Sequence, residues 1–195
     1  LRYEELGLFR RSLNLYSVYG LFIQDEFVKG ISYGMRTYET NGPSIIAVAP
    51  GQIGGVEDNG ELISRKGWVL LWSPELMQGT AWGKKMEEYG FFSYFSSNSL
   101  EMTPAEWDRI SLLIGQMRNE LQDHDDSPAL RGVLQGYLHV ILEYCNRIYL
   151  RQTSFGDKDS SDMLKRFNQL LLDYYAENKQ SGLGVPSVQY CASEL

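Results

Sequence analysis

Short hydrophobic runs in the first half of the chain show the two-residue alternation that is typical of β-strands. The runs cover residues 15–23, 31–38, 44–48 and 68–72, and turn-forming residues such as those at 58–60 separate them. Alternation of this kind predicts strands with one buried face, and the residues between the runs predict tight turns. Several short strands with frequent turns favour a β-barrel or a β-sandwich over regularly alternating strands and helices.

The pattern changes at residue 103, where apolar residues begin to recur at the three- and four-residue spacing of helices. Thr103 and Glu106 have the spacing of an N-terminal capping box, and Pro104 occupies the first helical position. A second, longer helix with a broad apolar surface is predicted to open at Ser127-Pro128. The predicted fold class is therefore α+β, with an antiparallel pair of helices after the strands and then a linker helix.

These changes divide the chain into consecutive segments. They are the strand-rich residues 1–102, the helical residues 103–155, a linker helix and polar linker over 156–184, and the opening of a further helical domain over 185–195. In the last segment, Ser187 can cap a helix whose apolar face includes Val188, Ala192 and Leu195. A helix of about ten residues is marginal by itself, so we expect the sequence to stop inside a domain.

Composition constrains the possible partners. The formal charge is −7 and the pI is about 4.9, and an acidic surface repels the phosphates of nucleic acids. We therefore do not expect these residues to bind DNA by themselves. No run reaches the roughly 18 apolar residues of a membrane span, so no membrane association is predicted. Cys145 and Cys191 are expected to be reduced thiols, which fits a cytoplasmic protein.

The sequence contains no recognisable catalytic motif. Its two histidines, His124 and His139, both fall in the helical half, whereas a metal site needs several ligands that converge from neighbouring elements. The spacing of His139 and Cys145 does not place them on one face of a helix. No nucleophile elbow and no phosphate-binding glycine loop is found. We therefore predict no catalytic residues, no metal, no cofactor and no enzyme activity.

A set of short motifs runs through nearly the whole chain. The motifs are Ala49-Pro50-Gly51-Gln52, Gly67–Trp72, Gly83-Lys84-Lys85, Tyr89–Tyr94, Asn146–Gln152, Phe167–Tyr175 and Gly184–Ala192. Their order and spacing resemble AraC-family transcription regulators, in particular those with a sensor half followed by a C-terminal pair of helix-turn-helix units. The resemblance implies a cupin-like β-barrel over 1–102, dimerisation through 103–155, and a DNA-binding domain that begins in the last segment. The candidate residues for that beginning are Ser187, Val188, Tyr190, Ala192 and Leu195.

A barrel of this kind can hold a small effector among the side chains that point inward. The candidate pocket residues are Tyr33, Met35, Trp68, Leu70 and Trp72, with Tyr19 and Arg36 as further candidates. The alternative is a barrel filled by its own side chains. The sequence does not decide which face of each strand points inward.

The long helix after residue 128 has two interpretations. Its apolar stripe can cover one side of the barrel, or part of it can pair with the same helix in a second copy, since two-fold operators favour two-fold dimers. The candidate dimer residues are Leu134, Leu138, Ile141, Leu142, Cys145 and Ile148.

The functional hypothesis is the effector-sensing and dimerisation part of an AraC-type transcription regulator. Its expected partners are a second copy of the chain, a small-molecule effector, and DNA through a helix-turn-helix domain that these residues do not include. One alternative is a cupin-like protein-interaction module with a filled barrel. Another is a cupin enzyme, which Gln52 opposes because it stands where many cupins place a metal-binding histidine.

Overall fold

A four-stranded antiparallel sheet forms the centre of the first of two units into which the structure divides, Leu1–Leu150 and Arg151–Leu195. Its strands, in spatial order, are β10 (Leu100–Glu101), β6 (Ser44–Val48), β3 (Tyr19–Gln24) and β9 (Gly67–Trp72). The computed structural model describes residues 1–25, 31–33, 36–38, 42–55, 58–92, 99–122, 128–153, 166–167, 169–171 and 173–195.

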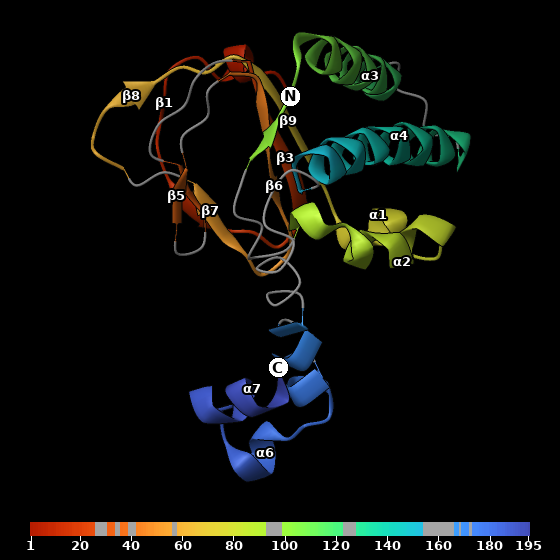
Figure 1. Cartoon of the computed structure of the whole chain (residues 1–195). Coiled ribbons are helices and arrows are strands. Elements are labelled where there is room, and N and C mark those ends of the chain that lie inside the picture. The colour runs from red at the N-terminus through yellow and green to blue at the C-terminus, as the bar shows by residue number, and fades with distance from the viewer. Residues whose placement is uncertain are drawn as a thin grey trace. The chain divides into compact units, whose positions relative to one another are not determined.

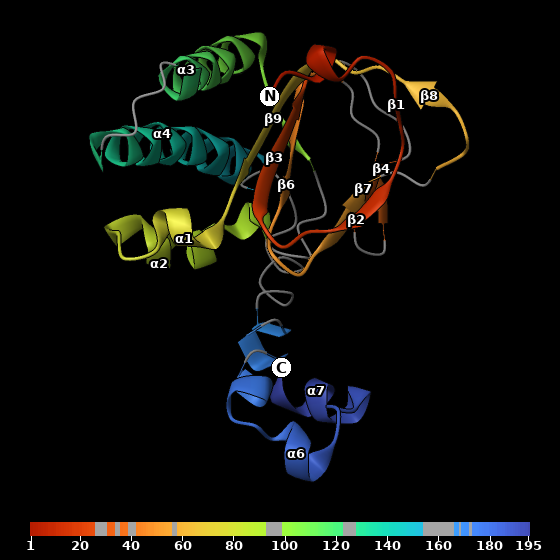
Figure 2. The same cartoon turned by 180° about the vertical axis from the view of Figure 1, so that it is seen from behind.

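The central strand of this sheet is apolar on both faces. In β3, Leu21 and Ile23 are fully buried on one face, and Phe22 points to the opposite face between them. A strand that is apolar on both sides is stable only where both faces of the sheet are covered. In this unit, helices cover one face and the remaining strands lie on the other (Figure 1 and Figure 2).

The remaining strands form two smaller antiparallel sheets. One pairs β1 (Phe9–Arg10) with β8 (Leu62–Ile63), and the other has the order β2 (Leu13–Leu15), β7 (Ile53–Gly55), β4 (Ile31–Tyr33), β5 (Arg36–Tyr38). A short 3₁₀-helix, η1 (Tyr3–Leu6), precedes them. Gly55 has a φ of 137°, and a Cβ at this position would lie 2.0 Å from the carbonyl oxygen of Ser12. Only glycine therefore permits the close approach of β7 to the chain just before β2.

The prediction of a cupin-like β-barrel is wrong for the part of the chain that the structure describes, because its strands form three separate antiparallel sheets and no closed barrel. Closure of a barrel requires each strand to pair with a neighbour on both sides. The outer edge of β9 pairs instead with the N-terminal residues: the Val69 amide donates to the carbonyl oxygen of Leu1 at 2.9 Å, and Arg2 forms a bridge with Trp68. The broader α+β class holds.

Helices form a layer on one face of the central sheet (Figure 1). They are α1 (Pro74–Met77), α2 (Ala81–Glu88), the 3₁₀-helix η2 (Gly90–Phe92), α3 (Pro104–Gln122) and α4 (Pro128–Thr153). The predicted cap of α3 is confirmed, since Thr103 and Glu106 exchange hydrogen bonds: the Thr103 amide donates to Glu106 Oε2 at 2.8 Å, and the Glu106 amide donates to Thr103 Oγ1 at 3.3 Å.

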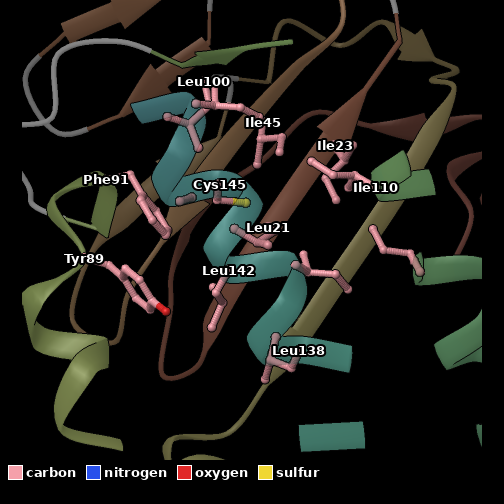
Figure 3. Packing of buried hydrophobic residues seen from close by; sticks show 14 of the residues in the cluster. Leu21, Ile23, Ile45, Tyr89, Phe91, Leu100, Ile110, Leu138, Leu142 and Cys145 are labelled. Atoms are coloured by element: carbon pink, nitrogen blue, oxygen red, sulfur yellow. The ribbon is translucent and has the colours of Figure 1, made fainter. Parts of the chain in front are cut away.

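The hydrophobic core lies between this helical layer and the sheet. Figure 3 shows Leu142 and Cys145 of α4 beside Leu21 and Ile45 of the two central strands, and all of these side chains are fully buried. Ile110 and Ile114 of α3 and Met86 of α2 belong to the same cluster. Burial of apolar surface contributes roughly 25 cal/mol per Å², so we expect this cluster to be the main source of stability of the unit.

The second unit contains α6 (Gln180–Leu183) and α7 (Val188–Glu194). The linker helix predicted over about 161–177 lies partly outside the described residues; residues 166–167, 169–171 and 173–176 are helical. The predicted cap of the last helix is confirmed, because Ser187 Oγ accepts a hydrogen bond from the Tyr190 amide at 3.1 Å. Tyr174 and Cys191 are the buried side chains of this unit among those that the structure describes, so its core is small.

Across the residues with described structure, no helix has both the length and the apolar character needed to cross a membrane.

Candidate functional site

A cavity of about 250 Å³ lies on the face of the central sheet that the helices do not cover. Its floor is a row of apolar side chains across three strands, because Phe22 of β3 is paired with Ile46 of β6 on one side and with Val69 of β9 on the other. The opposite walls come from η1, β1, β2, β7 and β8, and include Tyr3, Leu6, Phe9, Asn14, Tyr16 and Ile63. The site is therefore a largely apolar hollow between the central sheet and the outer strands.

The charged groups that line this cavity all have the same sign. Arg10, Arg11 and Arg65 are part of the lining, and among the described residues that line the cavity none is an aspartate or a glutamate. This contrasts with the chain as a whole, which has a formal charge of −7. A positive lining in an acidic protein favours a negatively charged ligand.

The three arginines differ in their surroundings. Arg10 is 67% exposed at its side chain and forms an ion pair of 3.4 Å with Asp58. The Arg65 guanidinium donates a hydrogen bond to Gln24 Oε1 at 3.3 Å. Arg11 is more buried, its nearest carboxylate is Glu61 at 3.9 Å, and its Nε is buried without a hydrogen-bond partner among the residues that the structure describes.

Two tyrosines supply further polar groups. Burial raises the pKa of the Tyr3 phenol well above its usual value, while the nearby Arg65 acts in the opposite direction. Burial also raises the pKa of Tyr16, and a hydrogen bond with Asn14 acts in the opposite direction. Both phenols therefore stay neutral at neutral pH, so they can take part in hydrogen bonds without adding negative charge to the cavity.

The turn between β6 and β7 positions one end of this site. Gln52, which the sequence places where many cupins have a histidine, is buried and serves as a structural link. Its side-chain oxygen accepts from the Ala49 amide at 2.6 Å, and its amide nitrogen donates to the carbonyl oxygen of Phe92 at 2.6 Å. The Tyr16 amide donates to the backbone oxygen of Gln52 at 2.9 Å. Gln52 thus connects the turn to η2 and to the chain beside β2.

Four of the residues predicted to line an effector pocket lie away from this cavity. Tyr19, Trp68, Leu70 and Trp72 are on the opposite face of the sheet, in the core that contacts the helices. The rings of Tyr19 and Trp72 stack there at 5.8 Å. Tyr33 and Arg36 pair through their backbones in the β4–β5 hairpin, and Met35 lies outside the described residues.

The residues predicted to form a dimer contact lie on the buried side of α4. Leu138, Ile141, Leu142, Cys145 and Ile148 are all 0% exposed and belong to the core cluster. Leu134 is half-buried against the same cluster. Their surface already contacts the sheet of their own chain (Figure 3), which is the first of the two interpretations of the apolar stripe.

Sequence reasoning missed the cavity residues for two reasons. Phe22 and Val69 are flanked by apolar neighbours, so alternation alone does not distinguish their face from the buried one. Arg10, Arg11 and Arg65 look like ordinary surface residues between short strands, and no local signal shows that they converge.

A second polar cluster connects α2 with α4. Lys85 forms an ion pair with Glu143, and the Tyr89 hydroxyl donates to the same carboxylate at 2.9 Å. His139 stacks on Trp82 with ring centroids 3.6 Å apart, and its Nδ1 lies 4.0 Å from Glu143. The hydrogen bond from Lys85 lowers the pKa of Glu143, so this carboxylate is ionised at neutral pH. The cluster holds α2 against α4.

Within the described ranges, no three or more His, Cys, Asp or Glu side chains are grouped so that they could hold a metal ion. His124 lies outside those ranges. No family model and no curated protein matches this chain.

Proposed function

We propose that this chain is the effector-sensing and dimerisation part of an AraC-type DNA-binding transcription regulator. It would control transcription through a C-terminal helix-turn-helix domain that begins at Ser187, with Val188, Tyr190, Ala192 and Leu195 in its first helix. The proposal includes a cytoplasmic location, with which the two free, buried cysteines are compatible.

The observation that carries the proposal is the ordered set of motifs that resembles this family, from Ala49-Pro50-Gly51-Gln52 to Gly184–Ala192. Two structural features support it. The chain divides into a sheet-based unit and a separate small helical unit. In the second unit, α7 begins at a Ser187 cap, as the first helix of the DNA-binding domain would.

A sensing role is supported by the cavity between the central sheet and the outer strands. A small-molecule site is typically a largely apolar hollow with a few polar groups that fix orientation, and this cavity has that character. The alternative of a protein-interaction module with a filled interior is less well supported, because the described side chains leave a cavity between the central sheet and the outer strands.

Dimerisation through the helical segment is proposed to use a surface other than the core face of α4. Exposed apolar side chains on that segment include Leu112 and Leu121 of α3 and Val133 and Val140 of α4. An apolar residue on an exposed helix face is free to enter a contact between copies, whereas a core residue is not.

The test of the regulator is specific DNA binding by the complete gene product that contains this chain. We expect nanomolar binding to a duplex from its own promoter, with an affinity that falls steeply as salt rises. The matched control is the 195-residue chain, which should not bind the duplex because it is acidic and lacks the proposed recognition helices. Equal, weak binding to promoter and unrelated duplexes by the complete product would refute the proposal.

Dimerisation is tested on the 195-residue chain by analytical ultracentrifugation. Val140→Glu places a charge on the exposed face of α4 and should weaken self-association at least tenfold, since a charge is costly in an apolar contact. Lys84→Glu, on exposed α2, is the matched control and should leave the association unchanged. A chain that stays monomeric at about 100 µM would rule out this part of the proposal.

A further inference from the structure

We propose that the cavity between the central sheet and the outer strands binds a small organic monocarboxylate with an apolar body, and that Arg11 receives its carboxylate. The inference names the chemical class of the effector and rests on the sensing role proposed above for its biological meaning. The binding chemistry itself is argued only from the residues that line the cavity.

The charge of the lining selects an anion. Three arginines line the cavity, and the carboxylates that pair with two of them, Asp58 and Glu61, are not part of the lining. The phenols of buried Tyr3 and half-buried Tyr16 remain neutral. An anion in this hollow therefore meets positive charge and hydrogen-bonding groups, and the described part of the lining holds no acidic side chain that would repel it.

Arg11 is the residue whose bonding is incomplete. Its Nε is buried and has no hydrogen-bond partner in the described part of the chain, and the 3.9 Å separation from Glu61 is too long for a hydrogen bond. A buried donor without a partner is destabilising, and a ligand that supplies the missing acceptor removes that cost. A carboxylate matches the planar guanidinium because its two oxygens can accept two parallel N–H bonds. Arg10 and Arg65, by contrast, have Asp58 and Gln24 as partners.

The remainder of the lining limits the body of the ligand. Phe22, Ile46 and Val69 form an apolar floor across the sheet, and Phe9 and Ile63 lie on the outer side. The volume of about 250 Å³ corresponds to the space of about eight water molecules in the liquid. This suits a compact acid of the size of benzoate. An apolar wall also makes burial of a doubly charged phosphate more costly than burial of a single carboxylate.

The experiment compares benzoate with its neutral isostere benzamide on the 195-residue chain, by isothermal titration and thermal unfolding. We expect benzoate to bind at least tenfold more tightly than benzamide. At about one hundred times its Kd, benzoate should raise the unfolding midpoint by roughly 5–10 °C. Phenylacetate with phenylacetamide, and hexanoate with hexanamide, extend the comparison to other apolar bodies.

Variants locate the site. Arg11→Gln should weaken carboxylate binding about 10- to 100-fold and leave the amides unaffected, because it removes a charge-assisted pair. Arg11→Lys keeps the charge but not the planar fork, so it should restore part of the affinity. Ile46→Phe should exclude acid and amide alike by filling the floor. The matched control is Arg109→Gln, which removes an exposed arginine from α3 and should change nothing.

Three results would overturn the inference: no stabilisation by any of the three acids at 10 mM, equal affinity for each acid and its amide, or an unchanged affinity in a folded Arg11→Gln variant. These results are distinguishable from failure of the regulator, which is measured by DNA binding of the complete gene product. Carboxylate binding without DNA binding would support the carboxylate site and refute the regulator proposal. DNA binding without carboxylate binding would support the regulator proposal and refute the carboxylate site.

Discussion

At the scale of single residues, neighbours on the central strands have opposite surroundings. Leu21 and Ile23 are in the core, and Phe22 between them faces the cavity. On β9, Trp68 is in the core and Val69 lines the cavity. A substitution on these strands therefore acts on stability or on the cavity according to which face it occupies.

The same contrast on α4 gives a measurable difference in stability. Leu142→Ala should lower the free energy of unfolding by about 2–5 kcal/mol, because it leaves a void in a fully buried cluster. Val140→Ala, on the same helix but 42% exposed, should cost less than about 1 kcal/mol. Urea unfolding followed by tryptophan fluorescence measures both. A Leu142 variant as stable as the Val140 variant would show that α4 does not pack on the sheet.

Residue identity alone could not assign these faces in the sheet. The alternation in β3 and β9 is visible in the sequence, but Phe22 and Val69 are as apolar as the core residues beside them. Both faces of the sheet are covered, so the usual contrast between an apolar and a polar face is lost. The arginines of the cavity come from separate segments, and only the folded chain brings them together.

At the scale of elements, local signals predicted most of the structure. The strand expected over 44–48 is β6, and the strand expected over 68–72 lies within β9. The helices expected after Thr103 and Ser127 are α3 and α4. The strand pairings could not be predicted in this way, because short strands with frequent turns are compatible with one barrel or with several sheets.

Glycine has a specific role where β9 begins beside β3. Gly67 has a φ of 126°, and a Cβ there would lie 2.1 Å from the carbonyl oxygen of Ile23. Gly67→Ala should therefore cost at least about 2 kcal/mol, because the backbone is strained and the pairing of β3 with β9 must shift.

Gly132 of α4 is the matched control for that variant. A Cβ at Gly132 meets no atom within 4 Å, so Gly132→Ala should stabilise the protein by about 0.5–1 kcal/mol through better helix propensity. Thermal and urea unfolding of both variants test the pair. Equal effects in the two variants would contradict the close approach at Gly67.

The Lys85–Glu143 pair between α2 and α4 predicts that the stability of the protein depends on pH. The hydrogen bond from Lys85 holds the pKa of Glu143 below its usual value of 4.5, so the unfolded state takes up this proton first as pH falls. The stabilising contribution is complete above the unfolded pKa and is lost as pH falls through the lower, folded pKa. Glu143 is more than a third exposed, so the contribution is modest.

Urea unfolding between about pH 5 and about pH 3 measures this contribution. Glu143→Gln should show a shallower loss of stability with falling pH than the unmodified chain. Lys85→Met should approach the same shallower slope, and Lys84→Met, which changes an exposed neighbour, should not. Parallel pH profiles for all of these proteins would exclude the pair as a source of the dependence.

At the scale of the whole molecule, the two units differ in the size of their cores. All four tryptophans lie in Leu1–Leu150, whereas the second unit has a core formed around Tyr174 and Cys191. A unit with little buried apolar surface opens more easily than a large one. We therefore expect the second unit to unfold before the first.

The two cysteines report on the units separately. Burial raises the pKa of Cys145 to about 12, so its thiolate is rare at pH 8 and its modification requires unfolding of the first unit. In a Cys145→Ser chain, Cys191 should react with a thiol reagent at a urea concentration at which tryptophan fluorescence is still native. In a Cys191→Ser chain, reaction of Cys145 should follow the fluorescence change. Simultaneous reaction of both thiols would show that the two units unfold as one.

The two-sided central sheet also has a consequence for how this protein can change over generations. Phe22, Ile46 and Val69 form one row across it, on the face opposite the helices. If the proposed site binds its ligand there, mutations confined to that row would alter which molecule is recognised and would preserve the scaffold that supports them. Residues that would set specificity thus alternate along the same strands with residues that stabilise the fold. A library that varies only Phe22, Ile46 and Val69 would therefore be expected to yield new binding preferences.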